Sequence, residues 1–429
     1  MLLRFGFENF RSFSEYQEIL LTASKQLKQN TDTLLIDMGK GIDAALPVAA
    51  IYGPNNSGKT NVLKAIRFFY HCVLYADGGK RKPKVSTFKL IPEYLDKPST
   101  FDIDIVVNNV HYNYGFKIKG RAFTEEWLYE YSYSKRRSRK TLFERSEKNQ
   151  FYFGNDFKGK NKTISTSIKE SDLFLSYAAL RFEHEKSIEL TEAIFESFKF
   201  RFGSDLSERK LAEAIEKNKN TKRITRFLED LDLEIVDIEV SSVEQDPKSI
   251  ELSKKLYEVL SENFDTDMEF PEESLVNKKI IIKKRNHENE IVDFAINDES
   301  LGTRALISIL TEVFEVIDEG GIFVVDELES SLHPLITKRI LDIFLDKNIN
   351  KNGAQLLFST HESTLLSHNE IRKDQVWFTD RNIYGETSLT SMLEYKVNSK
   401  VNIGKGYLEG RFGGVPVLDK FIDWGELDV

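Results

Sequence analysis

The sequence predicts an α/β fold that combines a parallel core sheet with an antiparallel β-subdomain and a helical insertion. Three observations carry this prediction. Continuous apolar runs, typical of parallel strands buried on both faces, alternate with amphipathic helical patterns near both ends of the chain. Short alternating segments rich in Tyr, Phe, Ile and Val follow the first of these parts, and helical periodicity follows the segments. We therefore predict a core at 1–70 and 285–429, a β-subdomain at 71–160 and a mainly helical lobe at 161–284.

The first part of the predicted core contains two strands and a helix. Apolar and polar residues alternate through Leu3, Phe5 and Phe7, which predicts a half-exposed strand. The run Pro47–Tyr52 is apolar throughout, which predicts a strand buried on both faces. From Lys59 onwards apolar residues recur at helical spacing, so we expect a helix after a short loop.

The middle of the chain changes from strands to helices. Three alternating segments separated by turn residues predict an antiparallel meander: Phe101–Val107, Tyr112–Ile118 and Trp127–Ser134. Helical patterns then occur in three stretches: Leu190–Phe202, Leu211–Leu231 and Ile250–Phe264. None of these stretches sustains a heptad repeat long enough for an extended coiled coil.

The second part of the predicted core resumes the alternation of helices and strands. Its elements are a helix at Thr303–Ile317, a strand at Ile322–Val325, a helix that begins near Pro334, and strands at Leu356–Phe358 and Val376–Phe378. Because helices separate the strands, we expect the strands to pair in parallel and the helices to cover the faces of the sheet.

Composition restricts the class of protein. With 429 residues the chain can bury a sizeable core and hold two or three subdomains. Cys72 is its only cysteine, so no disulfide can form within the chain. The N-terminus lacks the pattern of a secretory leader, and no run reaches the roughly 18 apolar residues of a membrane-spanning helix. We expect a cytoplasmic protein without a membrane partner.

Charge bears on nucleic-acid binding. The formal net charge is −9, so the surface as a whole is not expected to attract DNA. Two basic runs, Lys135–Lys140 and Lys283–Arg285, are interpreted as a solvated hairpin tip and a strand end. Contact with a phosphate backbone is the alternative interpretation of both runs, so DNA stays a candidate partner.

The strongest motif lies between the buried strand and the first helix. It fills the pattern GxxxxGK[ST] in full with Gly53, Pro54, Asn55, Asn56, Ser57, Gly58, Lys59 and Thr60. Glycines let such a loop turn its backbone N–H groups onto phosphates, and the following helix adds its positive end. We predict that the loop binds ATP, that Lys59 neutralises the β- and γ-phosphates, and that Thr60 is a ligand of Mg²⁺.

A second motif follows at the end of a later buried strand. Ile322–Val325 is directly followed by Asp326 and Glu327. Carboxylates at the C-terminal edge of parallel strands face the ligand crevice. We predict that Asp326 holds the Mg²⁺ shell and that Glu327 orients or deprotonates the attacking water.

Two further features are weaker when taken alone. Ser300 precedes a helix and Gly302 lies in its first turn, which makes an N-cap and an anion site. An ordinary cap is the alternative interpretation. His361 follows the third core strand, where it could sense a γ-phosphate, although a lone histidine is more often structural.

Taken together, these motifs resemble the ABC-class ATPases of the SMC, RecF and OLD group. More closely, the chain is similar to the stand-alone AAA-type ATPases typified by RloA, AbiL-type proteins and the ATPase of the PARIS anti-phage systems. The resemblance covers nearly the whole length and includes Asn9–Phe13, Ser300–Thr303, Leu332–Pro334 and Tyr407–Pro416. It implies a P-loop NTPase with an ABC-type ATPase head.

The resemblance also implies an assembly. Ser300 and Gly302 of one subunit would close over the ATP held by Lys59 of the other, in a head-to-tail homodimer or a larger homo-oligomer. Arg11 would lie near the nucleotide, with a surface salt bridge as the alternative interpretation. His361 is similar to the ABC switch histidine. The chain departs from the usual LSGGQ signature, which it replaces with Ser300–Thr303, and no glutamine marks a Q-loop near residues 87–89.

Two functions of different classes follow from these features. The first is a Mg²⁺-dependent ATPase that works as a dimer switch in anti-phage defence or DNA maintenance, together with a separate effector. The second is a slowly or non-hydrolysing ATP-gated scaffold that sequesters an effector nuclease or toxin. Both would carry the same motifs. A transporter ATPase is disfavoured by the long insertion between the two phosphate-site motifs.

A nuclease within the same chain is not expected. Too few residues follow His361 for another catalytic domain. The acidic pairs Asp102/Asp104 and Asp265/Asp267 lack a partnering Glu motif, and we interpret them as solvated acids. Relatives in the resembling families often pair with a small TOPRIM-like or toxin effector, so a separate effector chain is the expected partner.

Overall fold

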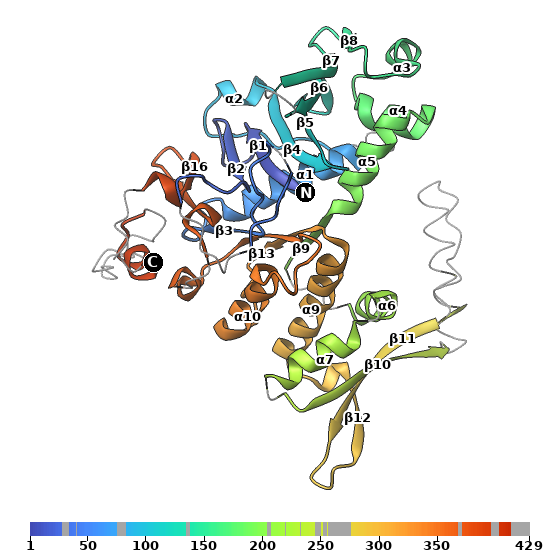
Figure 1. Ribbon diagram of the computed structural model, residues 1–429, viewed down its shortest axis with the longest axis vertical. Coiled ribbons are helices and arrows are strands. Elements are labelled where there is room, and N and C mark those ends of the chain that lie inside the picture. The colour runs from blue at the N-terminus through green and yellow to red at the C-terminus, as the bar shows by residue number, and fades with distance from the viewer. Residues whose placement is uncertain are drawn as a thin grey trace, which may run out of the picture. The chain divides into compact units, whose positions relative to one another are not determined.

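The computed structural model describes residues 1–27, 34–39, 41–74, 83–133, 138–203, 207–218, 220–231, 233–244, 250–251, 255, 276–367, 371–395 and 403–412 (Figure 1). The chain divides into two compact units, Met1–Gly203 with Val316–Val429 and Ser204–Glu315. The fold is mixed α/β, with one mostly parallel sheet and two antiparallel sheets. The three-part division expected from the sequence stays a prediction beside these two units.

A six-stranded sheet in the order β16-β15-β3-β14-β13-β9 forms the core of the first unit. Its strands are β3 (Val48–Tyr52), β9 (Phe198–Phe202), β13 (Ile322–Asp326), β14 (Gln355–Ser359), β15 (Val376–Arg381) and β16 (Thr387–Ser391). All neighbours pair in parallel except β15 and β16. Every residue of β3 and β14 is buried, which confirms the interpretation of the apolar runs as strands covered on both faces.

Helices cover both faces of this sheet. Helix α1 (Lys59–Leu74) begins where the periodicity predicts and lies between the core sheet and the antiparallel sheet of the same unit (Figure 1). Its Phe69 stacks on Phe116 of that antiparallel sheet with ring centroids 5.5 Å apart. Helix α10 (Pro334–Leu345) lies on the opposite face, with the expected proline in its first turn.

The antiparallel sheet of the first unit has seven strands in the order β2-β1-β4-β5-β6-β7-β8. They are β1 (Leu2–Glu8), β2 (Gln17–Leu20), β4 (Ser99–Val107), β5 (Val110–Lys119), β6 (Ala122–Ser132), β7 (Ser138–Arg145) and β8 (Phe151–Phe153). The meander predicted for β4, β5 and β6 is confirmed. The prediction of a half-exposed first strand holds only in part: Phe5 and Phe7 of β1 are buried and Phe5 packs on Phe69 of α1, whereas Arg4 and Glu8 are partly exposed.

A buried ion cluster lies on the outer face of β1 and corrects a second expectation. Asp102 and Asp104 are 6% and 8% exposed, so they are not solvated acids. Arg4 donates to both carboxylates, with Arg4 Nε 2.5 Å from Asp104 Oδ2. His111 Nε2 lies 2.7 Å from Asp104 Oδ1. The partner Arg4 comes from a strand far away in the sequence, so the local acidic pattern could not reveal it.

This cluster predicts an acid-sensitive contribution to stability. Burial raises the pKa of the Asp104 carboxyl, but the hydrogen bond from His111 and the charge of Arg4 outweigh it and hold the pKa below the usual 3.8. The ionised carboxylate therefore stabilises the fold above the usual value, and this contribution is lost as the pH falls below it. In urea unfolding, the free energy of unfolding of wild type should exceed that of Asp104→Asn at neutral pH. This difference between the two proteins should become smaller as the pH falls.

The matched control for this experiment is Asp96→Asn, because the Asp96 carboxylate is 94% exposed and 3.8 Å from Lys119. Its difference from wild type should be small at every pH. A gap between wild type and Asp104→Asn that stays constant as the pH falls would contradict the prediction.

Four short helices follow or precede the meander strands: α2 (Glu93–Asp96), α3 (Asn161–Ser167), α4 (Phe174–Phe182) and α5 (Glu185–Ser197). The helical pattern expected over Leu190–Phe202 is only partly right. Residues Phe198–Phe202 form β9, which pairs in parallel with β13 at the edge of the core sheet. The alternation Phe-Lys-Phe-Arg-Phe has the period of a strand, and three of its aromatic rings stack in sequence.

In the described residues of the second unit, helices accompany a three-stranded antiparallel sheet in the order β10-β11-β12. Its elements are α6 (Glu208–Asn218), α7 (Thr221–Glu229), β10 (Ile235–Glu244), β11 (Val276–Arg285), β12 (Ile291–Ala295), η2 (Ile296–Asp298) and the larger part of α9 (Leu301–Glu319). The helix expected at Leu211–Leu231 is thus two helices, and β10 was not expected. Asp265/Asp267 and nearly all of Ile250–Phe264 lie outside the described residues.

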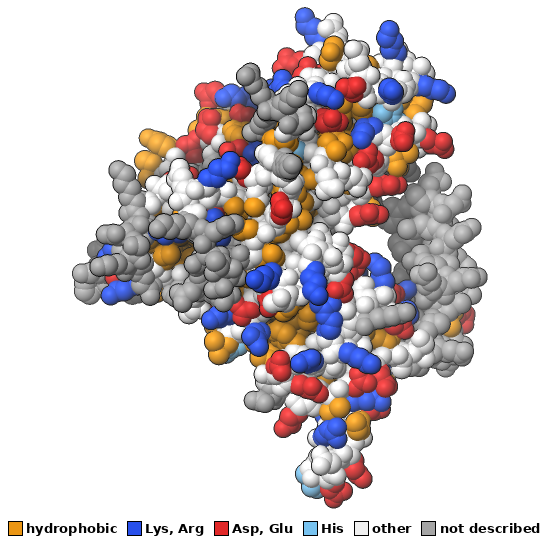
Figure 2. Space-filling view, in the orientation of Figure 1, with side chains coloured by type: hydrophobic (Ala, Val, Ile, Leu, Met, Phe, Trp, Pro, Cys, Tyr) orange, Lys and Arg blue, Asp and Glu red, His pale blue; other side chains and the backbone are white. Residues whose placement is uncertain are grey.

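The two basic runs show mixed outcomes. Lys283–Arg285 ends β11 as predicted, and Lys283 and Lys284 pair with Glu239 and Glu299 at 2.9 and 2.7 Å. In the other run, residues 135–137 lie outside the described residues. On the face shown in Figure 2, basic and acidic side chains are interspersed.

Short elements complete the C-terminal part: η3 (Ser363–Ser367), η4 (Lys373–Gln375), η5 (Met392–Glu394) and α11 (Ile403–Leu408). Helix α11 packs against η3, and its Tyr407 ring lies 5.6 Å from that of Tyr52 at the end of β3. Among the described residues, no helix has the length and apolar character needed to cross a membrane.

Candidate active site

The loop between β3 and α1 is shaped by two glycines. Gly53 adopts φ 156°, and a Cβ on it would lie 2.6 Å from the Thr379 carbonyl oxygen and would also collide with the Thr379 hydroxyl. Gly58 adopts φ 106°, and a Cβ there would lie 2.8 Å from Thr387 Cγ2. Only glycine fits either position, because β15 and β16 press against the loop. The sequence pattern therefore forms a tight loop between a buried strand and a helix, as predicted.

Lys59 is held over this loop. Its ammonium donates to the backbone oxygens of Gly53 and Pro54 at 2.9 and 3.1 Å, and the residue is 6% exposed. Burial lowers the pKa of Lys59 to about 8, although the carboxylates of Glu327, Glu329 and Asp326 act in the opposite direction. The loop therefore holds a cation in a poorly hydrated place, where an anion would be bound strongly.

The lowered pKa predicts a pH dependence of ATP binding. Below about pH 8 Lys59 is protonated before the nucleotide arrives, whereas above it the free protein must take up a proton to bind phosphate. ATP affinity should be nearly constant below this pH and fall about tenfold per pH unit above it. Isothermal titration calorimetry in buffers of different ionisation enthalpy measures both the affinity and the proton uptake. An affinity that does not change over the alkaline range would contradict the prediction.

Two oxygen ligands suitable for Mg²⁺ meet at the end of β13. Thr60 Oγ1 at the start of α1 donates to Asp326 Oδ1 at 3.0 Å. Ser359 Oγ, at the end of β14, donates to the same carboxylate oxygen at 2.6 Å. Mg²⁺ prefers a small number of carboxylate and hydroxyl oxygens together with phosphates and water. The donor set of Thr60 and Asp326 fits this ion.

Glu327 is exposed and has an unusual backbone conformation. Its φ is 55°, in the left-handed region that costs a non-glycine residue about 1 kcal/mol or more. Two hydrogen bonds hold it: Glu327 N donates to Ser359 Oγ at 2.8 Å, and Ser330 N donates to the Glu327 carbonyl at 2.8 Å. Strained residues of this kind concentrate at functional sites. Here the left-handed conformation turns the backbone directly after β13 ends at Asp326.

The segment after β14 lies beside the same strand ends. His361 N donates to Glu329 Oε1 at 2.6 Å. Burial lowers the pKa of the His361 imidazole, the charge of Lys59 lowers it further, and Glu329 gives the largest opposing effect. The electrostatic coupling places His361, Lys59 and Glu329 in one neighbourhood, next to Asp326 and Glu327. Sequence reasoning named four of these five residues and missed Glu329.

The other expected site residues lie in two places. Arg11 is exposed with its guanidinium carbon 5.5 Å from the Phe10 ring centroid, and its neighbour Ser12 accepts a hydrogen bond from Asn61 of α1 at 2.9 Å. Ser300 belongs to the second unit, where its hydroxyl accepts from Thr303 N at 3.1 Å and caps α9 as predicted. Gly302 lies in the first turn of that helix.

Contacts between distant segments supply groups that sequence reasoning did not assign to the site. Ser57 Oγ lies 2.6 Å from Thr379 Oγ1 of β15. The Tyr407 ring of α11 lies 5.6 Å from that of Tyr52, the residue before Gly53, and burial raises the pKa of the Tyr407 hydroxyl. The end of β3 that leads into the phosphate loop is therefore packed against α11, whose last two residues begin the closing segment Tyr407–Pro416 noted in the sequence. Residues 413–416 of that segment lie outside the described residues.

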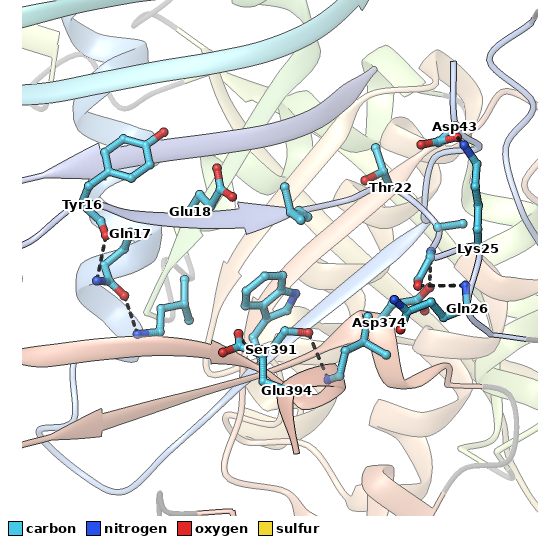
Figure 3. Close-up of a pocket in the computed structure, with 16 residues that line it drawn as sticks. Tyr16, Gln17, Glu18, Thr22, Lys25, Gln26, Asp43, Asp374, Ser391 and Glu394 are labelled. Carbon is cyan, nitrogen blue, oxygen red and sulfur yellow. Dashed lines mark hydrogen bonds and ion pairs between the residues drawn. The ribbon is translucent and has the colours of Figure 1, made fainter. Parts of the chain in front are cut away.

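A cavity of about 740 Å³ lies elsewhere in the first unit, between β2 and β16 (Figure 3). The polar side chains on its walls include Tyr16, Glu18, Lys25, Asp43, Asp374, Ser391 and Glu394. Gln17 Oε1 accepts a hydrogen bond from Leu389 N at 2.8 Å and so joins the two strand edges. The phosphate loop and the acids after β13 do not line this cavity among the described residues, so it is separate from the candidate active site.

Comparison with known families agrees with this geometry. A family model described as "AAA domain, putative AbiEii toxin, Type IV TA system" matches residues 48–367. The matched part begins at β3 and ends in η3, so it contains the phosphate loop, the acids after β13 and His361. Among curated proteins, none matches the chain.

Proposed function

Since the chain belongs to the AAA-domain family whose model matches residues 48–367, we propose that it binds Mg-ATP and hydrolyses it as an ABC-class dimer switch. A P-loop domain of this family implies nucleotide binding, typically with Mg²⁺. One observation carries the proposal furthest: β3, β13 and β14 bring Lys59, Thr60, Asp326, Glu327 and His361 to the same ends of three adjacent parallel strands.

Binding begins at the phosphate loop. Lys59 leaves the carbonyl oxygens of Gly53 and Pro54 and pairs with phosphate oxygens, which are better partners for its poorly hydrated ammonium. The N-terminal N–H groups of α1 point to the same place. Mg²⁺, when bound, neutralises charge on the phosphate oxygens. Thr60 and Asp326 are the residues that hold it.

Glu327 is the proposed general base. It orients a water molecule in line with the γ-phosphorus and accepts its proton as the oxygen–phosphorus bond forms and the bond to the leaving bridging oxygen breaks. Lys59 stabilises the charge that develops on the transferring group, and His361 contacts it from the end of β14. The left-handed backbone at Glu327 supports this role, because it turns the residue away from the buried strand and into solvent.

The dimer is part of the proposal. Ser300 and Gly302 of one subunit close over the ATP that Lys59 of the other subunit holds, in the head-to-tail manner of the families that the chain resembles. Two large exposed apolar side chains support such an interface: Leu301, between Ser300 and Gly302, is 56% exposed, and Leu335, directly after Leu332–Pro334, is 68% exposed. Higher homo-oligomers would be built from the same contact.

We further propose a role with a separate effector in anti-phage defence or DNA maintenance. The description of the matching family names a toxin and a type IV toxin–antitoxin system, and the motifs resemble RloA, AbiL-type and PARIS ATPases. A TOPRIM-like nuclease or a toxin is the effector class that this resemblance favours. The alternative is an ATP-gated scaffold with little or no hydrolysis. Both functions would carry the same motifs, so turnover has to be measured to separate them.

Steady-state ATP turnover by the purified chain tests the proposal, with and without a chelator of Mg²⁺. Turnover that requires Mg²⁺ supports the ATPase. Tight ATP binding without turnover, alone and with DNA or a co-purified effector, would replace it by the scaffold. A chain that binds no nucleotide would overturn both.

A further inference from the structure

Glu329 connects two segments of the candidate active site, the turn after β13 and the segment after β14. It lies in the turn after β13, two residues beyond Glu327, and its Oε1 accepts the backbone N–H of His361 at 2.6 Å. The contact joins the turn that carries the proposed base to the segment that carries the proposed switch histidine. It is a charge-assisted hydrogen bond, which is stronger than one between neutral groups.

Hydrogen bonds hold the residues on both sides of His361: Glu362 N donates to Thr360 Oγ1 at 2.9 Å, and Tyr52 Oη donates to the Glu362 carbonyl at 3.4 Å. Ser359 Oγ donates to Asp326, and Thr360 N donates to the Ile51 carbonyl at 3.0 Å, so the end of β14 is tied to both neighbouring strands. Beyond Thr360 the strand pairing ends. Glu329 is then the side chain that holds the backbone of His361 itself. The position of the His361 backbone, from which the imidazole extends, therefore depends on this carboxylate.

A second observation concerns the other oxygen of the same carboxylate. Glu329 Oε2 is buried and has no hydrogen-bond partner among the described residues. A buried polar atom without a partner is costly, and such atoms are rare unless a ligand or a conformational change supplies the partner. The negative charge of the carboxylate also raises the pKa of Lys59, Tyr52 and His361, against or together with the effect of burial on each.

We propose that Glu329 is a positioning residue that fixes His361 against the phosphate loop and thereby lets the protein distinguish a nucleoside triphosphate from a diphosphate. The inference rests on the proposed function, since it requires the nucleotide to bind at this loop. Glu329 touches neither nucleotide nor metal in this role. It acts through His361, whose side chain meets the terminal phosphate.

The test compares the affinities for ADP and for the non-hydrolysable analogue AMP-PNP, both with Mg²⁺, by isothermal titration calorimetry. The variants are Glu329→Ala, His361→Ala, the double variant and Glu329→Gln. Glu362→Gln is the matched control: it changes the acid next to His361, whose carboxylate accepts from Thr364 N at 3.0 Å instead. Thermal unfolding of each nucleotide-free variant checks that it folds.

Wild type and Glu362→Gln should prefer AMP-PNP by about tenfold or more, whereas Glu329→Ala and His361→Ala should each lose most of that preference. The double variant should be no worse than His361→Ala, because the two residues act as one unit. Glu329→Gln should keep most of the preference, since its amide oxygen can still accept from His361 N.

The opposite outcomes are distinct. A Glu329→Ala protein that keeps the preference, losses that add in the double variant, or a Glu329→Gln protein as defective as Glu329→Ala would each overturn the inference. A wild-type protein that binds ADP and AMP-PNP equally would also overturn the inference about Glu329. The proposal that the chain binds nucleotide would then still hold. A wild-type protein that binds neither would overturn the proposed function itself.

Discussion

Glu327→Gln should abolish ATP turnover while ATP binding persists. General-base catalysis contributes about 10²- to 10⁴-fold, and we expect a loss of turnover of this size. The substitution exchanges one carboxylate oxygen for an amide nitrogen and changes neither length nor shape. Glu327 is exposed, and the two hydrogen bonds described above use its backbone atoms: Glu327 N donates to Ser359 Oγ, and Ser330 N donates to the Glu327 carbonyl. The fold and the phosphate loop should therefore be unaffected.

The measurement combines steady-state turnover with the ATP dissociation constant and the mass of the complex in solution. If hydrolysis opens the dimer, the ATP-bound Glu327→Gln protein should stay dimeric where wild type returns to monomer. Glu319→Gln is the matched control, because Glu319 is an exposed acid at the far end of α9. Turnover of Glu327→Gln equal to that of wild type would remove Glu327 as the base.

The elements that the sequence predicts well are those whose signal is local. The phosphate loop is a continuous string between an unbroken apolar strand and an amphipathic helix, so both its residues and its context can be identified in a single window. The same holds for the strand before Asp326 and for the helix capped by Ser300, whose hydroxyl does accept from Thr303 N. Periodicity and capping act over a few residues, and no tertiary contact overrides them there.

Expectations failed where a distant partner decides the outcome. Asp102 and Asp104 alternate along a strand as solvated acids would, and only the pairing of β1 with β4 brings Arg4 to them. The strand β9 is short and lies directly after helix α5, so the helical pattern predicted over Leu190–Phe202 continues into it in spite of its alternating aromatic residues. In both cases the order of strands in a sheet, which a single sequence does not reveal, determines the environment.

The same limit applies to the candidate active site. Glu329 meets His361 because β13 and β14 are neighbours, and Thr379 meets Ser57 because β15 lies next to β3. The acidic run after β13 contains a third acid in the sequence, but nothing local indicates that its partner is a backbone N–H beyond another strand. Residues that touch substrate directly carry motif signals, whereas residues that position them are found through topology.

Lys59→Met should remove most of the affinity for ATP. A charge-assisted hydrogen bond contributes about 1.5 to 3 kcal/mol, and Lys59 is expected to make two, so we expect a loss of about 100-fold or more. Methionine keeps the length and the apolar stem of the side chain. Lys64→Met is the matched control on the same helix, where the side chain is half-buried but does not lie on the phosphate loop.

The thermal stability of the nucleotide-free protein should not fall when Lys59 is replaced by methionine. Burial lowers the pKa of Lys59 to about 8, which means that the fold holds its charged form at a cost. Removing the charge should therefore leave thermal stability unchanged or raise it, even though two carbonyl acceptors lose their donor. Loss of binding together with undiminished stability distinguishes a residue kept for a ligand from one kept for the fold. A Lys59→Met protein that binds ATP as wild type does would place the phosphates elsewhere.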